Sequence, residues 1–434
     1  MPIRSRPSKP MTFWAAVSLG IGAMIGAGIF ALLGEAGAIA GPAVYLSFIL
    51  GGIIALFSGY SLGKLGARFP AAGGIVEYLV QSYGVGILSG SMSIMLYFAA
   101  VVSLSLIAKT FGNYAATLLP ASAGNNWHHV FAVGIIVFFV LMNLRGAKDV
   151  AFWEKLTVAI KFTVLVALSV IGLIFLKPEL LSPARYPPTS SIFFSLAITF
   201  FAYEGFRVIT NTAEDMPNPT KTLPRAMITA ILLVMLLYVA VAFAVFGHLS
   251  TEQVIESKEY ALAQAALPIF GPLGFTIVAI TALVSTASSI NANLYAVTNV
   301  TYQLAKDGEL PEAFGHPLGH SREGLVISSS LVIVLNLFFN LSAIAAIGSI
   351  SVLFVHGVTH IGHLRIRHET GASFFLVLLA ALLSIGAMIL ALTYIARTST
   401  GVFWTLALFI SVAIITEVLF QRILGRKIKP RVPT

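Results

Sequence analysis

The chain alternates long apolar stretches with short polar segments that carry most of its charge. A helix needs about 20 mostly apolar residues to cross the hydrocarbon core of a bilayer. Stretches of that length predict twelve membrane-spanning helices. The predicted spans lie at about residues 12–40, 43–66, 86–118, 129–146, 150–176, 190–213, 223–247, 271–304, 325–341, 343–363, 372–396 and 401–422. Spans 9 and 10 share one nearly continuous apolar run, which we divide near Asn340.

The composition indicates an all-α polytopic membrane protein. Of the 434 residues, 58% are hydrophobic and 10% are charged, and the mean hydropathy is +0.93, whereas soluble domains are about 25% charged. The absence of cysteine excludes disulfides and thiolate metal sites. The net charge of +9 does not indicate a nucleic-acid partner, because the basic residues are spread over many loops. We expect one transmembrane domain over residues 1–434, embedded in the lipid bilayer.

The basic residues predict how the chain is oriented. Cytoplasmic loops of membrane proteins carry an excess of Lys and Arg. With a cytoplasmic N-terminus, the outer loops hold only four of the 26 basic residues, namely Lys177, Arg185, Lys258 and Arg397. An even number of spans then places both the N- and C-termini in the cytoplasm, with the protein in the plasma (inner) membrane.

Two spans contain stretches that favour an interrupted helix. Residues 20–30 of span 1 include four glycines within nine residues, and each glycine costs about 1 kcal/mol relative to alanine in a helix. Residues 200–206 of span 6 place Glu204 and Gly205 near mid-membrane. Irregular backbone at that depth must be buried in protein or line a cavity.

The positions of the two interruptions predict a repeat. Five spans separate them, so we expect inverted repeats over about residues 12–176 and 190–363, with additional helices over about 372–422. Interrupted spans at corresponding positions of inverted halves are typical of a transporter's binding site.

The glycine stretch has two other interpretations. Gly20-x-Gly22 begins like a dinucleotide-binding loop, but Gly26 falls one place late and no strand precedes it. Gly22 and Gly26 also have the spacing of close helix packing. In an interrupted helix, the backbone amides of Ala27 and Gly28 would point at a carboxylate.

Glu204 is an ionisable residue near mid-membrane, which makes it a functional candidate. Arg207 lies three residues further, within reach on a helix. The two form a structural ion pair, or Glu204 receives a substrate amine or a proton. Phe201 either packs in the core or closes over the substrate as an aromatic lid.

Lys161 lies about 16 Å along span 5, near the bilayer centre, at 1.5 Å per residue. Its ammonium is either fixed onto carbonyls or Glu204, or it gains and loses a proton, because desolvation favours the neutral form. In span 8, Ser285, Ser288 and Ser289 share one helical face. Their hydroxyls would hold a sodium ion or receive the Lys161 ammonium, or they serve only helix packing.

Three histidines of span 10, His356, His360 and His363, line one helical face. No carboxylate accompanies them in that span, so we expect no metal site. A role in pH sensing stays open, and otherwise they are interfacial residues at the cytoplasmic end of the span. No nucleophile–base pair or phosphate-binding loop indicates an enzyme.

Four motifs resemble those of the amino acid–polyamine–organocation (APC) superfamily. Residues 26–30 (GAGIF) are similar to its G-S/A-G-I-F motif, and residues 201–206 (FAYEGF) to its span-6 F-x-Y/F-x-G-F motif. Residues 213–226 resemble its A-E-x-x-x-N-P…x-P-R-A loop, and residues 305–311 (AKDGELP) its loop after span 8. The resemblance covers nearly the whole chain and is nearest to the ApcT-type proton-coupled amino acid transporters.

The resemblance implies a LeuT-type fold of five-plus-five inverted helices and a set of site residues. The Lys161 ammonium would stand where related sodium symporters hold sodium, with the Gly22 carbonyl and a span-8 hydroxyl as partners. Phe201 would be the gate. The implied substrate-binding residues are Met24, Ile25, Gly26, Ala27, Gly28, Phe201, Ala202 and Glu204, and the implied proton-coupling residues are Lys161, Gly22, Ser285, Ser288 and Ser289. The charged pair Glu204 and Arg207 departs from the ApcT-type pattern, so Glu204 favours cationic substrates or is neutralised by Arg207.

We therefore expect a secondary active transporter that imports amino acids with protons by alternating access. It would need no cofactor besides the proton as coupling ion. The alternatives are an exchanger of amino acids or amines, a sodium symporter, a channel and a non-transporting amino acid receptor.

Overall fold

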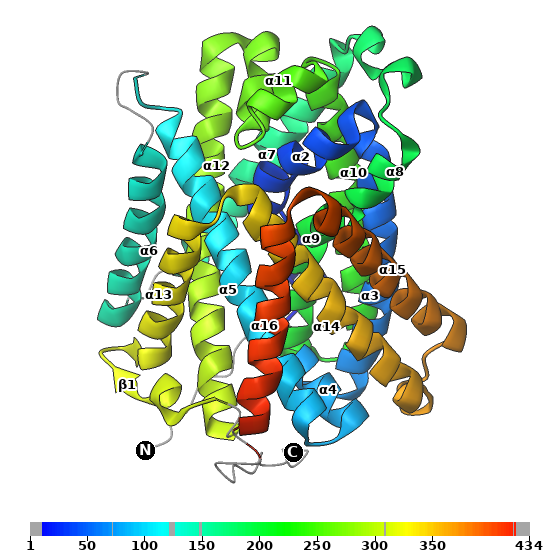
Figure 1. Ribbon diagram of the computed structural model, residues 1–434, viewed down its shortest axis with the longest axis vertical. Coiled ribbons are helices and arrows are strands. Elements are labelled where there is room, and N and C mark those ends of the chain that lie inside the picture. The colour runs from blue at the N-terminus through cyan, green and yellow to red at the C-terminus, as the bar shows by residue number, and fades with distance from the viewer. Residues whose placement is uncertain are drawn as a thin grey trace.

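Helices make up nearly all of the chain in the computed structural model, which describes residues 11–71, 73–120, 126–146, 150–307, 310–419 and 421 (Figure 1). Within these residues, ten helical segments are long and apolar enough to cross a membrane. Two shorter apolar helices, Phe13–Met24 and Glu323–Phe338, occur beside them. The protein is therefore an all-α polytopic membrane protein, as the apolar stretches predict.

The elements follow one another along the chain in this order. The first part comprises α1 (Phe13–Met24), α2 (Ala27–Ala40), η1 (Gly41–Ala43), α3 (Val44–Arg68), α4 (Ile75–Tyr83), α5 (Ile87–Ala116), α6 (Trp127–Arg145), α7 (Val150–Ile174), η3 (Pro178–Leu181) and η4 (Pro183–Arg185). The middle part comprises α8 (Thr189–Phe194), α9 (Leu196–Tyr203), η5 (Glu204–Asp215), α10 (Pro219–Phe246), α11 (Thr251–Glu256) and α12 (Ala261–Asp307). The last part comprises η6 (Glu312–Gly315), the antiparallel strands β1 (Pro317–Leu318) and β2 (Ser321–Arg322), and α13 (Glu323–Phe338), α14 (Leu341–Thr370), α15 (Phe374–Thr398) and α16 (Thr400–Val418).

Each predicted span coincides with helical structure, and the two predicted interruptions are confirmed. Span 1 consists of α1 and α2, and span 6 consists of α8, α9 and η5. The predicted start of span 8 at residue 271 coincides with a kink at Gly271, whose φ of 70° and ψ of −167° are not helical, so α12 consists of two helical parts. The short helix α4 between α3 and α5 was not predicted.

Two polar side chains explain why spans 9 and 10 separate where they do. The side chain of Asn340 accepts a hydrogen bond from the Ala343 amide at 2.8 Å and so caps the start of α14. Lys109 of α5 donates to the carbonyls of Asn336 and Phe339 at 2.7 Å each, where α13 ends. A cation at the C-terminal carbonyls of a helix is favourable, so Lys109 fixes this corner of the fold.

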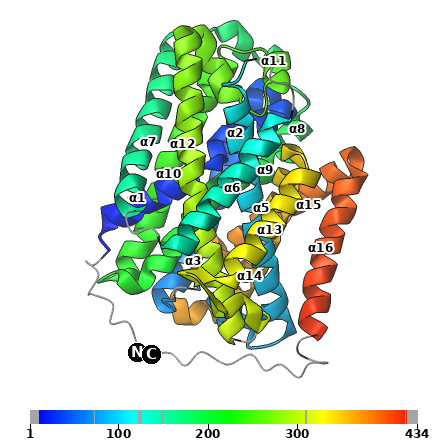
Figure 2. The same cartoon turned by 90° about the vertical axis from the view of Figure 1, so that its left-hand side faces the viewer.

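Two helices form the centre of the bundle. In an 18-residue apolar stretch of each helix, 83% of the residues of α5 and 78% of those of α14 are buried. The corresponding shares are 11% for α6 and 17% for α16. α5 and α14 therefore lie inside, and α6 and α16 lie outside, as Figures 1 and 2 show.

The two ends of the bundle differ in charge. α4 and β1 lie at one end and α11 at the other (Figure 1). We call the first end, which carries Lys64, Arg68, Arg322 and Arg365, the basic end.

Candidate functional site

The first interruption leaves the start of α2 open for binding. α1 ends at Met24 and α2 begins at Ala27, and Gly26 between them has φ −116° and ψ −115°, outside the helical region. The amides of Ala27 and Gly28 therefore lie in a first helical turn, where backbone N–H groups have no partner within the helix. The positive end of the helix dipole adds to their attraction for an anion.

The second interruption is a change of helix type. α9 ends at Tyr203, and η5 continues from Glu204 to Asp215 as a 3-10 helix of 12 residues. Runs of 3-10 helix longer than three or four residues are uncommon and often mark functional segments. The glutamate predicted near mid-membrane thus begins the altered segment.

The two interruptions touch each other, backbone against backbone. A Cβ on Gly205 would lie 2.4 Å from the Met24 amide nitrogen, and one on Gly28 would lie 2.5 Å from the Ala202 carbonyl oxygen. Only glycine permits such approach. Tyr238 of α10 joins the same two segments, because its hydroxyl lies 2.7 Å from the Met24 carbonyl and 3.2 Å from the Ala202 carbonyl.

A cavity of about 70 Å³ lies where the interruptions meet. Five predicted substrate-binding residues line it, namely Met24, Gly28, Phe201, Ala202 and Glu204. The lining residues are Ala23, Met24, Gly28, Leu32, Ser103, Leu106, Ile107, Phe201, Ala202, Glu204, Gly205, Arg207, Val208, Ser289 and Asn293. Phe201 is 5% exposed, and its ring packs against Gly348 of α14, whose added Cβ would lie 2.7 Å from the ring.

Other predicted residues are not among those that line the cavity. Ile25 is fully buried, and its carbonyl accepts a hydrogen bond from the Ser285 hydroxyl at 3.0 Å. Gly26 packs against Ser289, whose hydroxyl would lie 2.5 Å from an added Cβ. Ser288 is half-buried and, among the described residues, is not part of the cavity wall. Ser285 and Ser289 thus contact the first interruption, and the coupling role of the three serines stays a prediction.

The carboxyl group of Glu204 lies between the side chains of Arg207 and His356. Its Oε1 accepts from Arg207 Nε at 2.5 Å, and its Oε2 lies 3.4 Å from His356 Nε2. The predicted contact between Glu204 and Arg207 is thus present, and Arg207 also faces the cavity. A buried carboxylate needs such partners, because unpaired burial of charge is costly.

Lys161 is 2% exposed and donates a hydrogen bond to the Gly22 carbonyl at 2.7 Å. This contact ties α7 to α1, two residues before α1 ends. The side chain of Val158, one turn earlier on α7, packs against Gly22 and would lie 2.8 Å from a Cβ there. A larger residue at Gly22 would push the two helices apart.

The sequence suggested that the histidines of span 10 are interfacial, but the structure buries them. His356, His360 and His363 are all fully buried in α14. They face Ser58 and Ser61 of α3, with which they form hydrogen bonds. The polar face predicted by their spacing thus packs inward, because α14 lies at the centre of the bundle.

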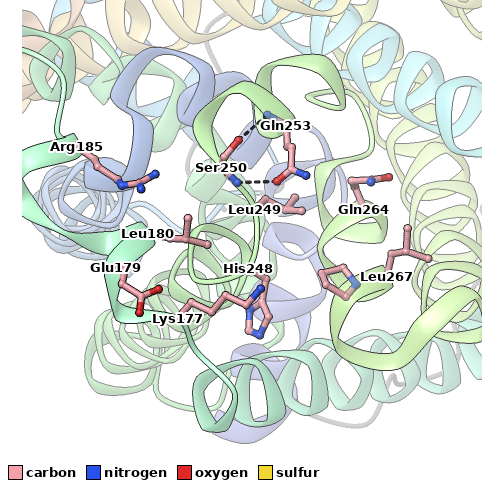
Figure 3. A pocket seen from close by; sticks show the side chains of 11 residues that line it. Lys177, Glu179, Leu180, Arg185, His248, Leu249, Ser250, Gln253, Gln264 and Leu267 are labelled. Atoms are coloured by element: carbon pink, nitrogen blue, oxygen red, sulfur yellow. Dashed lines mark hydrogen bonds between the residues drawn. The ribbon is translucent and has the colours of Figure 1, made fainter.

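A larger cavity of about 460 Å³ opens at the end opposite the basic end (Figure 3). Its wall includes Lys177, Arg185 and His248, remote from both interruptions in the sequence. Two of its polar side chains, those of Ser250 and Gln253, are already occupied, since they cap α11 reciprocally at 2.9 and 3.3 Å. Figure 3 shows this pair at the upper rim. We regard this hollow as a surface feature.

An all-helical membrane protein in which two interrupted helices meet around a buried cavity has the architecture of a secondary transporter. The chain belongs to the amino acid permease family, whose model matches residues 11–416.

Several relatives extend over most of the chain. It is 37% identical to the uncharacterized protein MJ0609 of Methanocaldococcus jannaschii, over 96% of this chain and 97% of that one. It is 36% identical to the inner membrane transport protein YbaT of Escherichia coli, over 86% and 88%. It is 29% identical to the serine/threonine exchanger SteT of Bacillus subtilis, over 70% and 69%.

Some residues of the site were not predicted from the sequence. Tyr238 stands in an apolar span with no local signal of its role. Ser103 is one of several serines in span 3, and nothing in the sequence distinguishes it. Asn293 lies one turn after Ser289, to whose carbonyl it donates at 2.8 Å, so the polar face of span 8 would have indicated it.

Proposed function

We propose that the protein is a secondary active transporter that imports an amino acid together with a proton. The observation that carries this proposal is the hydrogen bond from Lys161 to the Gly22 carbonyl beside the interruption. Hydrogen bonds from an ammonium are about twice as strong as neutral ones. Protonation of Lys161 would therefore hold α1 against α7, and loss of the proton would loosen that tie and let α1 move.

The substrate would bind between the two interruptions. Its carboxylate would meet the amides of Ala27 and Gly28, and its amine the carbonyls of Phe201 and Glu204. The Met24 carbonyl, also expected to bind the amine, already accepts from Tyr238 at 2.7 Å and from Gly26 at 2.9 Å. It would become available only if the site rearranges.

The cavity favours a small amino acid. Its volume of about 70 Å³ is well below the roughly 300–1,000 Å³ of pockets for drug-sized ligands. The name of the Bacillus subtilis relative, a serine/threonine exchanger, agrees with small polar substrates. We further propose that the basic end faces the cytoplasm of the cell and that the protein lies in the inner membrane, on the rule that cytoplasmic loops are basic.

A thermal-shift screen of the purified protein against the standard amino acids and polyamines would identify the ligand. A ligand at about 100 times its Kd adds about 2.7 kcal/mol of stability. The ligand found is then used for transport in proteoliposomes with an acidic outside. We expect the pH gradient to drive its accumulation.

The variant Lys161→Met tests the coupling group. It should still exchange external for internal substrate but lose accumulation driven by the gradient. Lys109→Met is the matched control for lost stability, because Lys109 is another buried lysine that donates to backbone carbonyls; it should lower stability but keep accumulation driven by the gradient. Accumulation by Lys161→Met at the wild-type level would contradict coupling through Lys161.

An exchanger is the second candidate, and the name of the Bacillus subtilis relative favours it. An obligate exchanger would take up labelled substrate only into vesicles preloaded with substrate. Uptake into empty vesicles under a pH gradient would exclude it.

A further inference from the structure

A chain of buried polar side chains runs from the substrate cavity toward the basic end. It begins at Glu204, which lines the cavity. Oε2 of Glu204 lies 3.4 Å from Nε2 of His356. Among the described residues neither atom has a hydrogen-bond partner, so this contact is the longest step of the chain. Nδ1 of His356 then lies 2.7 Å from the Ser58 hydroxyl.

The chain continues through α3 and α14 in alternation. The Ser58 hydroxyl lies 2.9 Å from Nε2 of His360. Nδ1 of His360 lies 2.9 Å from the Ser61 hydroxyl, which lies 2.8 Å from Nδ1 of His363. Nε2 of His363 lies 2.8 Å from the hydroxyl of Thr370, the last residue of α14. Thr370 is half-buried, so the chain ends near the surface of the basic end.

His360 and His363 use both ring nitrogens in hydrogen bonds, one toward each neighbour. His356 bonds Ser58 through Nδ1, and its Nε2 lies 3.4 Å from Glu204 Oε2. A buried histidine that serves only packing needs a partner for each nitrogen, but those partners need not be shared. Here each serine hydroxyl lies between two imidazoles, accepting from one and donating to the next. Thr370 completes the order by donating to the Arg367 carbonyl at 3.0 Å. The hydrogen bonds from His356 to Thr370 can therefore all point the same way.

The surroundings keep the chain dry and place charge at its two ends. The three histidines and both serines are fully buried. The rings of Phe200 and Phe206 lie 5.5 and 5.9 Å from that of His356.

The charged groups beside the chain come from other elements. Arg207 of η5 holds the other oxygen of Glu204, and Lys64 follows Ser61 by about one turn of α3. Tyr83 of α4 donates to the Val358 carbonyl of α14 at 2.7 Å and packs under Arg365.

We propose that the side chains from Glu204 to Thr370 form a proton relay between the substrate cavity and the basic end. This proposal rests on the proposed function, since it supplies a route by which the transported proton leaves the site. It assigns to Glu204 the role of proton acceptor at the cavity. The three histidines would carry the proton from Glu204 to the basic end, a role that Lys161 does not fill.

The steps conserve protons. A protonated Glu204 gives its proton to Nε2 of His356, while Nδ1 of His356 gives one to Ser58. The hydroxyl proton of Ser58 passes to Nε2 of His360, and Nδ1 of His360 gives one to Ser61.

The last steps release one proton for the one that entered. The hydroxyl proton of Ser61 passes to Nδ1 of His363, and Nε2 of His363 gives one to Thr370. The Thr370 hydroxyl turns away from the Arg367 carbonyl and gives its own proton to water. Only O–H and N–H bonds form and break, and the chain resets by rotation of hydroxyls and exchange of tautomers.

The test uses proteoliposomes that hold a pH-sensitive dye, with the amino acid found by the thermal-shift screen as substrate. Ser58→Ala removes one link, and His360→Gln keeps polar contacts but cannot accept and release a proton. We expect each to lower substrate-dependent proton influx by roughly 100-fold, the scale of a lost proton-transfer group. Substrate affinity and exchange between equal internal and external substrate should stay at the wild-type level.

Two controls separate a relay from a structural role. Ser58→Thr keeps the hydroxyl and should retain proton influx. His248→Gln changes another buried histidine, whose Nδ1 contacts the Ala244 carbonyl at 2.8 Å far from α14 in the sequence, and should behave as wild type.

The outcomes are distinct. Wild-type proton influx in both Ser58→Ala and His360→Gln would overturn the relay while leaving proton-coupled transport intact. Affinity, exchange and influx that fall together in proportion would also overturn it, because that pattern indicates a structural network. A wild-type protein that exchanges amino acid without moving protons would overturn the proposed coupling and the relay together.

Discussion

Gly205→Ala is the substitution that most directly tests whether the two interruptions must touch. Gly205 is the second residue of η5, and its φ lies outside the left-handed region. The substitution is therefore not strained by backbone conformation. Its added Cβ would meet Ala23 and Met24, where α1 ends.

The structure gives the size of the effect. The Cβ would lie 2.4 Å from the Met24 nitrogen and the Ala23 carbonyl carbon, about 1 Å short of ordinary van der Waals contact. These are backbone atoms, so no side chain can turn away, and α1 must separate from η5. Overpacking of this kind costs about 1–3 kcal/mol, and we expect the upper value. If that cost falls on the substrate-bound state, affinity decreases by roughly 100-fold, since about 1.4 kcal/mol is tenfold.

Two measurements check this prediction. The unfolding temperature in detergent can be followed by the fluorescence of the four tryptophans, and substrate affinity by calorimetry. Gly386→Ala is the control, because a Cβ there meets nothing within 4 Å and alanine favours a helix by about 1 kcal/mol. Wild-type affinity and unfolding temperature in Gly205→Ala would refute the conclusion that the interruptions are in obligatory contact.

Three further outcomes follow from other contacts. Tyr238→Phe removes the hydroxyl that bonds both interruptions and should lower the free energy of unfolding by about 1 kcal/mol, measured by thermal unfolding. It should also lower substrate affinity, and unchanged affinity would contradict a role of Tyr238 in holding the site. Lys109→Met leaves two carbonyls without their cation and should cost roughly 3 kcal/mol, whereas the exposed Lys177→Met should cost nothing measurable by the same assay. Lys258→Ala removes the ion pair in which Lys258 Nζ lies 3.6 Å from Glu35 Oε1, at the end opposite the basic end. A single cysteine introduced in the cavity should then react faster with an external thiol reagent. An unchanged labelling rate would show that this contact does not restrict entry.

The sequence by itself determined the class of protein, the spans and the two interruptions. These features are local: the length of an apolar stretch decides whether it can cross a bilayer, and glycines within it decide where the helix weakens. For the same reason the glycine stretch at residues 20–30 and Glu204 could be found from composition and position alone. The depth of Lys161 followed from the rise of a helix per residue.

Only the tertiary structure decided which distant groups meet. Tyr238 lies 214 positions from Met24 and 36 from Ala202, yet it binds both. The spacing of the three histidines predicted a shared face but not that it would turn inward onto Ser58, 298 positions before His356. A side chain reveals its hydrogen-bonding capacity in the sequence, whereas its partner depends on the register in which α3 and α14 pack. That register is set by the fit of many apolar side chains along both helices, and no single stretch of the chain contains it.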